Sequence, residues 1–513
     1  MLQIKNLTIS HKKDLRLLLE DFNLVLNPGD KAVLIGEEGN GKSTLLKWIY
    51  DPALIESYGE AAGARIAPGE RLAYLPQELP EALQGRTLAE YFGDNPDYWS
   101  HSPRELAALL AQLGLPEDFP FREQALGSLS GGEKVKAQML ALLLTEPTLL
   151  LLDEPSNDLD LDTLAWLEEF IRKSDKTVLF ISHDESLIEA AATMVIHLEQ
   201  LRKKSKLRYS VARIPYDEYM SRRESSFSQQ AREAASQRRE KRIRDEKFRR
   251  IHDSVEAAQE NVSRQDPSTA RLLKKKMHAV KSLERRFARE DEKMTDFPEQ
   301  EEAIFFKFDE ARSAMPAGKI VLDLDEKELR NPAGVLLARD LKLFVRGPEK
   351  IGIVGKNGCG KSTLLKEIAG RLLPREDIRA AYMPQNYEDS LEGDLTPLAF
   401  LCPGGDKEAL TRIRSYLGAL RYRPEEMEHP MGALSGGQRA KLLLLKMSLS
   451  GAHVLLLDEP TRNFSPLSGP VIRRLLSEYP GAIISISHDR KYLKTVCTAV
   501  YELGPEGLHP VAL

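Results

Sequence analysis

Two stretches of the chain have the residue types and spacing of a phosphate-binding loop. Residues 36–43 (GEEGNGKS) and 355–362 (GKNGCGKS) both read G-x-x-x-x-G-K-S. In such a loop backbone N–H groups wrap the phosphates, the lysine contacts the β- and γ-phosphates, and the serine hydroxyl binds Mg²⁺. One match alone can be a glycine-rich turn, but two favour triphosphate binding. The predicted nucleotide ligands are Gly36, Glu37, Glu38, Gly39, Asn40, Gly41, Lys42, Ser43 and Thr44, and Gly355, Lys356, Asn357, Gly358, Cys359, Gly360, Lys361, Ser362 and Thr363.

Two acidic residues, Glu37 and Glu38, lie inside the first loop. Carboxylates beside a triphosphate repel it unless solvent separates the charges. We therefore expect both side chains to point outward, into solvent.

A run of apolar residues ending in Asp-Glu-Pro follows each loop later in the chain. The acidic pairs are Asp153-Glu154 and Asp458-Glu459. Ligands of open α/β sheets collect at the carboxyl ends of buried strands. The aspartate suits the Mg²⁺ shell, and the glutamate can polarise the water that attacks the γ-phosphate. A lone Asp-Glu-Pro is more often a strand-end turn, so its order after the loop carries this prediction.

A glutamine and a histidine repeat in register with these motifs. Gln77 and Gln385 can reach the metal or the water, and His183 and His488 can hold the γ-phosphate or the water. A single such residue would more often be structural, but the repetition reverses that preference. The predicted catalytic residues are Glu154, Glu459, His183, His488, Gln77 and Gln385, and the predicted metal ligands are Ser43, Asp153, Gln77, Ser362, Asp458 and Gln385.

Strands that alternate with helices must position these side chains. Residues 31–35 and 350–354 read as strands that lead into the two loops, and a helix pattern follows each loop. Residues 148–152 and 177–181 read as further buried parallel strands. The fold class is therefore α/β, with two P-loop domains over residues 1–210 and 319–513.

A third repeated motif identifies a family. Residues 129–133 (LSGGE) recur at 434–438 (LSGGQ), 305 positions later, and the Asp-Glu-Pro and Ser-His-Asp motifs share that offset. This order of motifs resembles the ATP-binding cassette superfamily. The resemblance implies an ATPase that uses ATP and Mg²⁺, and whose two cassettes close head to tail inside a monomer. It further implies that Ser130, Gly131 and Gly132 cap the ATP on Lys361, and that Ser435, Gly436 and Gly437 cap the ATP on Lys42.

The two copies are not identical. The second reads TRNFSPL at residues 461–467, where the first reads SNDLD at 156–160, so we expect the two sites to turn over at different rates. Neither loop is preceded by a convincing aromatic residue to stack on adenine, and His11 is the nearest candidate in the first copy.

Residues 211–318, between the cassettes, predict a helical hairpin. No glycine or proline occurs from Tyr216 to Ser263, and residues 265–268 (QDPS) supply a break, so we place the tip near residues 263–272. Apolar positions repeat at heptad spacing, as in an antiparallel coiled coil. The seam is predicted to contain Phe248, Ile251, Val255, Ala258, Val262, Leu273, Met277, Val280 and Phe287.

Charge is unevenly distributed along the chain. The formal net charge is −5, yet residues 222–289 contain 20 Lys and Arg against 10 Asp and Glu, a net of +10. A solvated helix face is the ordinary explanation for such a run. The two-to-one cationic excess on a long rod between ATPase domains nevertheless favours a polyanionic partner, because lysine and arginine make phosphate contacts.

The tandem cassettes with a long charged hairpin resemble the ABC-F family of translation factors and ribosome-protection proteins. That resemblance implies a 70S ribosome partner, with the hairpin approaching the P-site tRNA and the rRNA of the peptidyl-transferase centre. The linker length and the DEPTRN sequence at residues 458–463 look most like the antibiotic-resistance branch. The alternative within the family is a housekeeping translation factor. We do not expect the arm insertion or the basic C-terminal tail that some members have.

Other functions fit the chain less well. A transporter ATPase needs no 108-residue rod, and chromosome ATPases split one cassette with their coiled coil, whereas each half here holds a complete motif set. Three scattered cysteines exclude a cysteine-built iron–sulfur domain. The sequence shows no stretch of roughly 20 apolar residues and no secretory leader, so we expect a cytoplasmic protein with no membrane partner.

Overall fold

The computed structural model describes residues 1–200, 206–260, 267–291, 294, 308, 310–387, 390–391 and 393–512. These residues form two compact units. One contains Met1–Tyr216 and Glu301–Leu513, and the other contains Asp217–Gln300. The predicted tip of the hairpin is only partly covered, because residues 263–266 lie outside the described ranges.

The first half of the larger unit is built on a six-stranded sheet in the order β5-β6-β7-β3-β8-β9. All neighbouring strands are parallel except β8 and β9. Side chains of β3, β6 and β7 are buried throughout, as their unbroken apolar runs predict. The strands are β3 (Lys31–Ile35), β5 (Leu72–Leu75), β6 (Leu149–Asp153), β7 (Thr177–Ile181), β8 (Met194–Gln200) and β9 (Lys206–Ala212).

The second half repeats this sheet strand for strand, in the order β13-β14-β15-β12-β16-β17. Again the only antiparallel neighbours among the described strands are the last two, β16 and β17. The mixed α/β fold with two sheet-based cassettes is therefore confirmed. The strands are β12 (Lys350–Val354), β13 (Ala380–Met383), β14 (Val454–Asp458), β15 (Ala482–Ile486), β16 (Ala499–Gly504) and β17 (Gly507–Val511).

An antiparallel sheet accompanies each half. In the first, β1 pairs with both β2 and β4, and in the second β10 pairs with β11. Alternating buried and exposed positions along these strands fit sheets with one covered face. The strands are β1 (Leu2–His11), β2 (Leu17–Leu26), β4 (Gly59–Ile66), β10 (Ile320–Arg330) and β11 (Leu336–Arg346).

Corresponding helices follow corresponding strands in the two halves. The helices after the two loops are α1 (Lys42–Tyr50) and α13 (Lys361–Leu372), and those after the Leu-Ser-Gly-Gly motifs are α6 (Gly131–Leu144) and α17 (Gly436–Ser450). The remaining α-helices of this unit are α2 (Glu81–Gln84), α3 (Leu88–Gly93), α4 (Pro96–Ser100), α5 (Pro103–Leu113), α7 (Leu161–Lys173), α8 (Glu185–Ala191), α12 (Glu310–Ser313), α14 (Pro397–Leu401), α15 (Lys407–Ala419), α16 (Pro424–Glu428), α18 (Gly469–Ser477) and α19 (Arg490–Val496).

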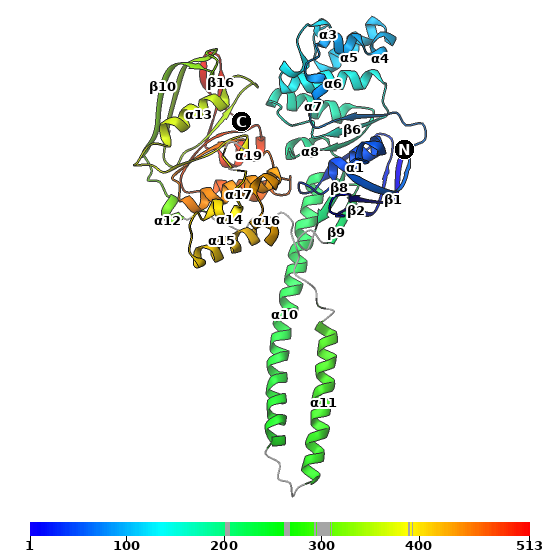
Figure 1. The fold of residues 1–513 in the computed structure, drawn as a ribbon, viewed down its shortest axis with the longest axis vertical. Coiled ribbons are helices and arrows are strands. Elements are labelled where there is room, and N and C mark those ends of the chain that lie inside the picture. The colour runs from blue at the N-terminus through cyan, green and yellow to red at the C-terminus, as the bar shows by residue number, and fades with distance from the viewer. Residues whose placement is uncertain are drawn as a thin grey trace. The chain divides into compact units, whose positions relative to one another are not determined.

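The smaller unit is a pair of long helices, α10 (Tyr216–Glu260) and α11 (Pro267–Asp291), which run side by side (Figure 1). Val255, Leu273 and Val280 are buried, and the rings of Phe248 and Phe287 meet edge to face with centroids 5.7 Å apart. Arg244 is an unpredicted member, since it stacks on the Phe287 ring and forms ion pairs with the acidic end of α11.

One predicted seam position is wrong. Ile251 is 51% exposed, whereas His252 is only partly exposed. An α-helix advances 3.6 residues per turn, so the positions three and four after Phe248 both lie near the seam, and this helix turns the fourth inward. Among the described residues, no helix combines the length and apolar character that a bilayer crossing requires.

Candidate functional site

Both phosphate-binding loops have the backbone that their glycines predict. Gly36 has φ 148° and Gly355 has φ 145°, and a Cβ at either position would approach a strand carbonyl oxygen within 2.4 and 2.7 Å. The ammonium group of Lys42 donates to the carbonyl oxygens of Gly36 and Glu37 at 2.8 and 3.0 Å. Lys361 makes the same two bonds in the second loop. Each lysine is thus held at the centre of its loop.

Other loop residues take fixed positions. Asn40 is buried, and its side-chain amide donates to the carbonyl oxygen of Leu198 at 3.0 Å. Gly39 accepts a bond from Arg16 at 2.8 Å. Burial raises the pKa of the Cys359 thiol. The predicted ligands Thr44 and Thr363 lie in the first turns of helices α1 and α13.

The predicted Mg²⁺ ligands meet at the ends of β6 and β14. Ser43 donates to Asp153 at 3.0 Å, and Ser362 hydrogen-bonds Asp458 in the same way. Burial raises the pKa of both aspartates. Hydroxyl and carboxylate oxygens are the hard ligands that Mg²⁺ prefers, so this set fits the ion.

The two predicted glutamines do not behave alike. Gln77 donates to Glu154 at 3.2 Å, beside the metal ligands of its own cassette. Gln385 instead donates to Asp158 of the first cassette at 3.5 Å. The described geometry therefore brings Gln77 to the acidic pair, while Gln385 spans the two halves.

The acidic pair of the first cassette is locked by hydrogen bonds. Glu154 lies 3.0 Å from Nε2 of His183 and accepts a bond from Asn157 at 2.6 Å. The other ring nitrogen of His183 lies 2.8 Å from the carbonyl oxygen of Phe464, in the second cassette. Burial raises the pKa of Glu154, but the charge and hydrogen bond of His183 outweigh it and lower that pKa to about 2.

The equivalent pair of the second cassette is looser. Nε2 of His488 is 3.7 Å from Glu459, whose other oxygen accepts the His488 backbone N–H at 3.3 Å. Burial and the neighbouring Asp458 raise the pKa of Glu459 to about 8, and burial with Lys361 lowers the pKa of His488 to about 4. Glu154 and Glu459 both have left-handed backbone, with φ 50° and 52°, a strain that sequence patterns did not predict.

The second loop and the first Leu-Ser-Gly-Gly motif line one cavity of 1090 Å³, which we call the second composite site. Ser130 caps α6, and its backbone and hydroxyl both bond Glu133 in a capping box. The predicted site residues that line this cavity are Ser130, Gly131, Gly358, Gly360, Lys361, Ser362, Thr363, Asn357, Gln385, Asp458, Glu459 and His488, together with Gln77 and His183.

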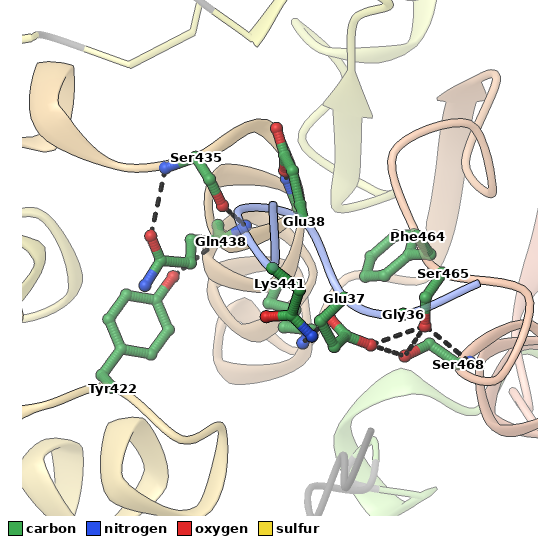
Figure 2. Close-up of polar contacts among 12 residues, drawn as sticks. Gly36, Glu37, Glu38, Tyr422, Ser435, Gln438, Lys441, Phe464, Ser465 and Ser468 are labelled. Carbon is green, nitrogen blue, oxygen red and sulfur yellow. Dashed lines mark hydrogen bonds and ion pairs between the residues drawn. The ribbon is translucent and has the colours of Figure 1, made fainter. Parts of the chain in front are cut away.

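The first loop and the second Leu-Ser-Gly-Gly motif form the first composite site, which is bridged by side chains (Figure 2). Glu38 accepts bonds from the backbone N–H groups of Gly436 and Gly437 at 3.2 and 2.5 Å. Glu37 accepts bonds from Lys441, Ser465 and Ser468. Ser435 caps α17 and bonds Gln438.

The expectation that Glu37 points into solvent is therefore wrong, whereas Glu38 is exposed but its carboxylate also accepts the two backbone bonds. The Glu37 side chain is 15% exposed and lies 3.2 Å from Nζ of Lys441. Hydroxyls of Ser465 and Ser468 reach the other Glu37 oxygen at 2.6 and 2.9 Å. Burial alone would raise the pKa of Glu37, but Lys441 and the two hydroxyls lower it to about 2, so the carboxylate is charged. The residues near Glu37 in sequence predict repulsion, whereas its cation, Lys441, and its two serine donors lie more than 400 positions later.

Two arginine–glutamate pairs between the cassettes also escaped prediction. Arg473 binds Glu185 through both carboxylate oxygens at 3.0 and 2.9 Å, and Arg490 binds Glu168 at 3.1 Å. Residue 473 is the repeat of 168, and 490 is the repeat of 185, at the offset of 305. The two pairs are thus symmetry-related with the charges reversed, a signal that was readable from the aligned repeats.

Comparisons with known proteins agree with this architecture. A family model described as ABC transporter matches residues 19–157 and 338–462. The chain is 28% identical to the probable ATP-binding protein YbiT of Escherichia coli O157:H7, over 95% of this chain and 94% of that relative. It is 26% identical to ABC transporter F family member 5 of Arabidopsis thaliana, over 95% and 72% of the two chains.

Solved structures share the fold. A complex of the archaeal ribosomal stalk protein aP1 and the archaeal ribosome recycling factor aABCE1 matches with a TM-score of 0.59 and 16% identity, covering 99% of this chain and 90% of that one. A model of ribosome-bound archaeal Pelota and ABCE1 matches with a TM-score of 0.56 and 16% identity, covering 98% and 78%.

Proposed function

Because the chain belongs to the ABC transporter family, as an ABC-F type ATPase with tandem cassettes, we propose that it binds the ribosome through its basic hairpin. The cassettes hydrolyse ATP. The observation that carries the ribosome proposal is the +10 charge of residues 222–289 within a chain of net charge −5. Ribosomal relatives among the structural matches support the same partner.

Residues of both cassettes contribute to each ATP site. Lys361 and the loop amides bind the phosphates, and the amide end of α6 caps them from the other cassette. Ser362 and Asp458 would hold Mg²⁺, which would supply positive charge to balance the β- and γ-phosphates. Glu459 orients the attacking water, and His488 positions Glu459 and the γ-phosphate. The same roles in the first composite site fall to Lys42, Ser43, Asp153, Glu154 and His183.

Closure of the cassettes around ATP then drives the work on the ribosome. ATP favours the closed arrangement and hydrolysis releases it, so nucleotide state sets the population of a two-state closure. The hairpin approaches the P-site tRNA and the rRNA of the peptidyl-transferase centre, and the cytoplasmic protein thereby protects the ribosome against antibiotics. A housekeeping role in translation is the second candidate, favoured by full-length similarity to relatives such as YbiT.

A trapped variant tests ribosome binding. Glu154→Gln together with Glu459→Gln keeps the shape of both sites but removes the groups that activate water. We expect the double variant to bind ATP, hydrolyse it slowly and sediment with ribosomes in a sucrose gradient containing ATP. A double variant that stays at the top of the gradient contradicts the proposal.

Hairpin charge provides a matched control. Lys274, Lys275 and Lys276 are exposed on α11, and changing all three to Gln is expected to weaken cosedimentation and reduce its salt dependence. Changing Lys5, Lys327 and Lys342, exposed lysines of the cassette sheets, alters the net charge equally and should have little effect. Equal losses from the two triple variants would assign the binding to general charge instead.

The antibiotic role is tested at the predicted tip. Alanine substitutions within residues 263–272 should change which ribosome-targeting drugs are antagonised, while ATP hydrolysis by the purified protein stays unchanged. Minimum inhibitory concentrations with and without expression are the measurement. Variants that alter hydrolysis and never resistance would favour the housekeeping candidate.

A further inference from the structure

The first composite site contains carboxylates where a nucleotide phosphate is expected. Glu38 bonds the backbone N–H groups of Gly436 and Gly437, at the N-terminus of the 15-residue helix α17. Helix N-termini with free N–H groups bind anions, and in the head-to-tail arrangement this one faces the γ-phosphate on Lys42. A side chain of the first loop therefore occupies the donors that would cap its own ATP.

Differences in the facing cassette match this acidic loop. Lys441 lies 3.2 Å from Glu37 and its side chain is only 8% exposed. Its repeat in the first cassette is Lys136, whose ammonium group lies instead over the Trp166 ring, 4.9 Å from the centroid. The same residue type thus faces the loop on one side of the molecule and turns to a neighbouring ring on the other.

Two serines complete the match. Ser465 and Ser468 donate to Glu37, whereas their repeats in the first cassette are Asp160 and Thr163, which bond each other at the start of α7. A carboxylate opposite Asp160 would be repelled. Accordingly, the second loop carries Lys356 and Asn357 in place of Glu37 and Glu38, and Asn357 bonds the Asp158 backbone. Serine donors therefore face the first loop, which carries the carboxylates, whereas Asp160 takes the equivalent place opposite the second loop, which lacks them.

We propose that Glu37 and Glu38 are built-in anionic ligands of the second Leu-Ser-Gly-Gly helix that compete with the γ-phosphate of ATP at the first composite site. This inference rests on the proposed composite ATP sites. It assigns specificity between two otherwise similar sites: ATP binds readily at the open second site, and at the first only after Glu38 leaves the Gly436 and Gly437 amides.

The carboxylates also link the two cassettes at the first site. Glu37 is charged at every pH above about 2, so its bonds to Lys441, Ser465 and Ser468 persist at neutral pH. A hydrogen bond to a charged group is stronger than one between neutral groups. At neutral pH the ionised Glu37 therefore links the two cassettes at the first site.

The test is the number of ATP molecules bound per chain. In the Glu154→Gln, Glu459→Gln background, radiolabelled ATP in equilibrium dialysis should show one tight site and a second site weaker by about tenfold or more. Replacing the acidic pair with the residues of the other loop, Glu37→Lys with Glu38→Asn, should bring both sites to similar affinity. Two equal sites before the replacement, or no gain after it, would overturn the proposal.

A second pair of variants leaves the loop untouched. Ser465→Ala with Ser468→Ala removes two donors that hold Glu37 without changing the net charge and should strengthen ATP binding at the first site. Thr163→Val, the matched control in the first cassette, should not. Thermal unfolding by circular dichroism identifies variants that are folded. If the double serine variant is folded and leaves the weak site unchanged, the carboxylates are not held as proposed.

Loop lysines separate this inference from the proposed function. In the same background, Lys361→Ala should remove the tight site, and Lys42→Ala should remove only the weak one. Equal losses of ATP binding from both variants would contradict the inferred difference between the sites, but they would not contradict the ATPase activity. A parent protein that binds ATP as expected but does not sediment with ribosomes contradicts the proposed function and leaves the inference standing.

Discussion

The two composite sites share their motifs but differ in what faces each loop. At the second, Lys361 and the Ser130 motif line an open cavity of 1090 Å³. At the first, Glu37 and Glu38 bridge the corresponding groups. A repeated motif thus predicts a fold and a ligand class, while residues of the facing cassette determine how ATP reaches each loop.

The acidic pairs differ in the same sense. Glu154 is held by His183 and Asn157 at hydrogen-bonding distance, whereas Glu459 is 3.7 Å from His488. Among the described residues, buried Nδ1 of His488 has no hydrogen-bond partner, while Nδ1 of His183 contacts the carbonyl oxygen of Phe464. Glu154 and His183 are thus more completely hydrogen-bonded than Glu459 and His488.

The largest expected effect separates the two glutamates. Glu459→Gln should lower ATP turnover by about 100-fold or more, because it removes water activation at the accessible site. Glu154→Gln should lower it only about twofold to threefold, since the first site is gated. Phosphate release at saturating ATP is the measurement. Equal losses of ATP turnover in the two single variants would contradict the functional difference between the sites.

A smaller effect is expected at the buried ion pair between the two cassettes. Arg473→Met should lower the free energy of unfolding by about 3 kcal/mol, because Glu185 stays 6% exposed with less positive charge around it. Arg490→Met should cost about 1 kcal/mol, since Arg490 is 31% exposed. Urea unfolding followed by circular dichroism measures both.

Reversing the charges is the control for that prediction. The double variant Arg473→Glu with Glu185→Arg keeps the pair while Lys491, 3.0 Å from Glu185, becomes a like charge. We expect partial recovery relative to Arg473→Glu alone. If the double variant is no more stable than Arg473→Glu alone, local packing and not ion pairing determines the loss of stability.

Glycines of the two Leu-Ser-Gly-Gly motifs provide a third contrast. A Cβ at Gly131 would lie 2.3 Å from the carbonyl oxygen of Asp158, whereas at Gly436 the nearest atoms are 3.5 Å away. Gly131→Ala should therefore lower stability by about 1–2 kcal/mol and shift the residue that bonds Asn357. Gly436→Ala should be close to neutral. Similar melting temperatures for the two variants would contradict the close contact between residue 131 and the Asp158 carbonyl oxygen.

The smallest expected effect depends on pH. Asp184 caps α8, and burial with the nearby Asp489 raises its pKa to about 6 from an ordinary 3.8. Its stabilising contribution is present below pH 3.8 and is lost as the pH rises through 6, because the native state holds the proton more tightly. Asp184→Asn should thus gain about 1 kcal/mol relative to the parent between pH 5 and pH 7.5.

Urea unfolding of both proteins at the two pH values checks this, and Asp489→Asn, at the repeated position, is the comparison. A stability difference that does not change with pH would contradict the shift. Hydrogen bonding by Asn at the cap keeps the helix start intact in either case.

Much of the fold followed from the repeated motifs. Strand, glycine-rich loop and helix recur with fixed spacing, and the chain forms the two α/β cassettes and the hairpin helices that this spacing predicts. The partners of Glu37 could not be predicted in this way. Its neighbours in sequence argued for repulsion, and its stabilising cation, Lys441, lies 404 positions away. Local rules describe elements, but contacts across a seam depend on tertiary geometry.

The hairpin shows the same limit at smaller scale. Heptad spacing located α10 and α11, yet it could not choose between Ile251 and His252, which differ by one step around the helix. The near-equal geometry of spacing three and four leaves that choice to the facing helix.

The reversed charges of the two arginine–glutamate pairs bear on how this chain finds its partner cassette. Glu168 and Glu185 both belong to the first cassette, and Arg473 and Arg490 both belong to the second. Two first cassettes from different molecules would place glutamate against glutamate, and two second cassettes would place arginine against arginine. After duplication, the halves have become complementary instead of self-complementary. Each half therefore pairs favourably with the other half and is repelled electrostatically by a copy of itself.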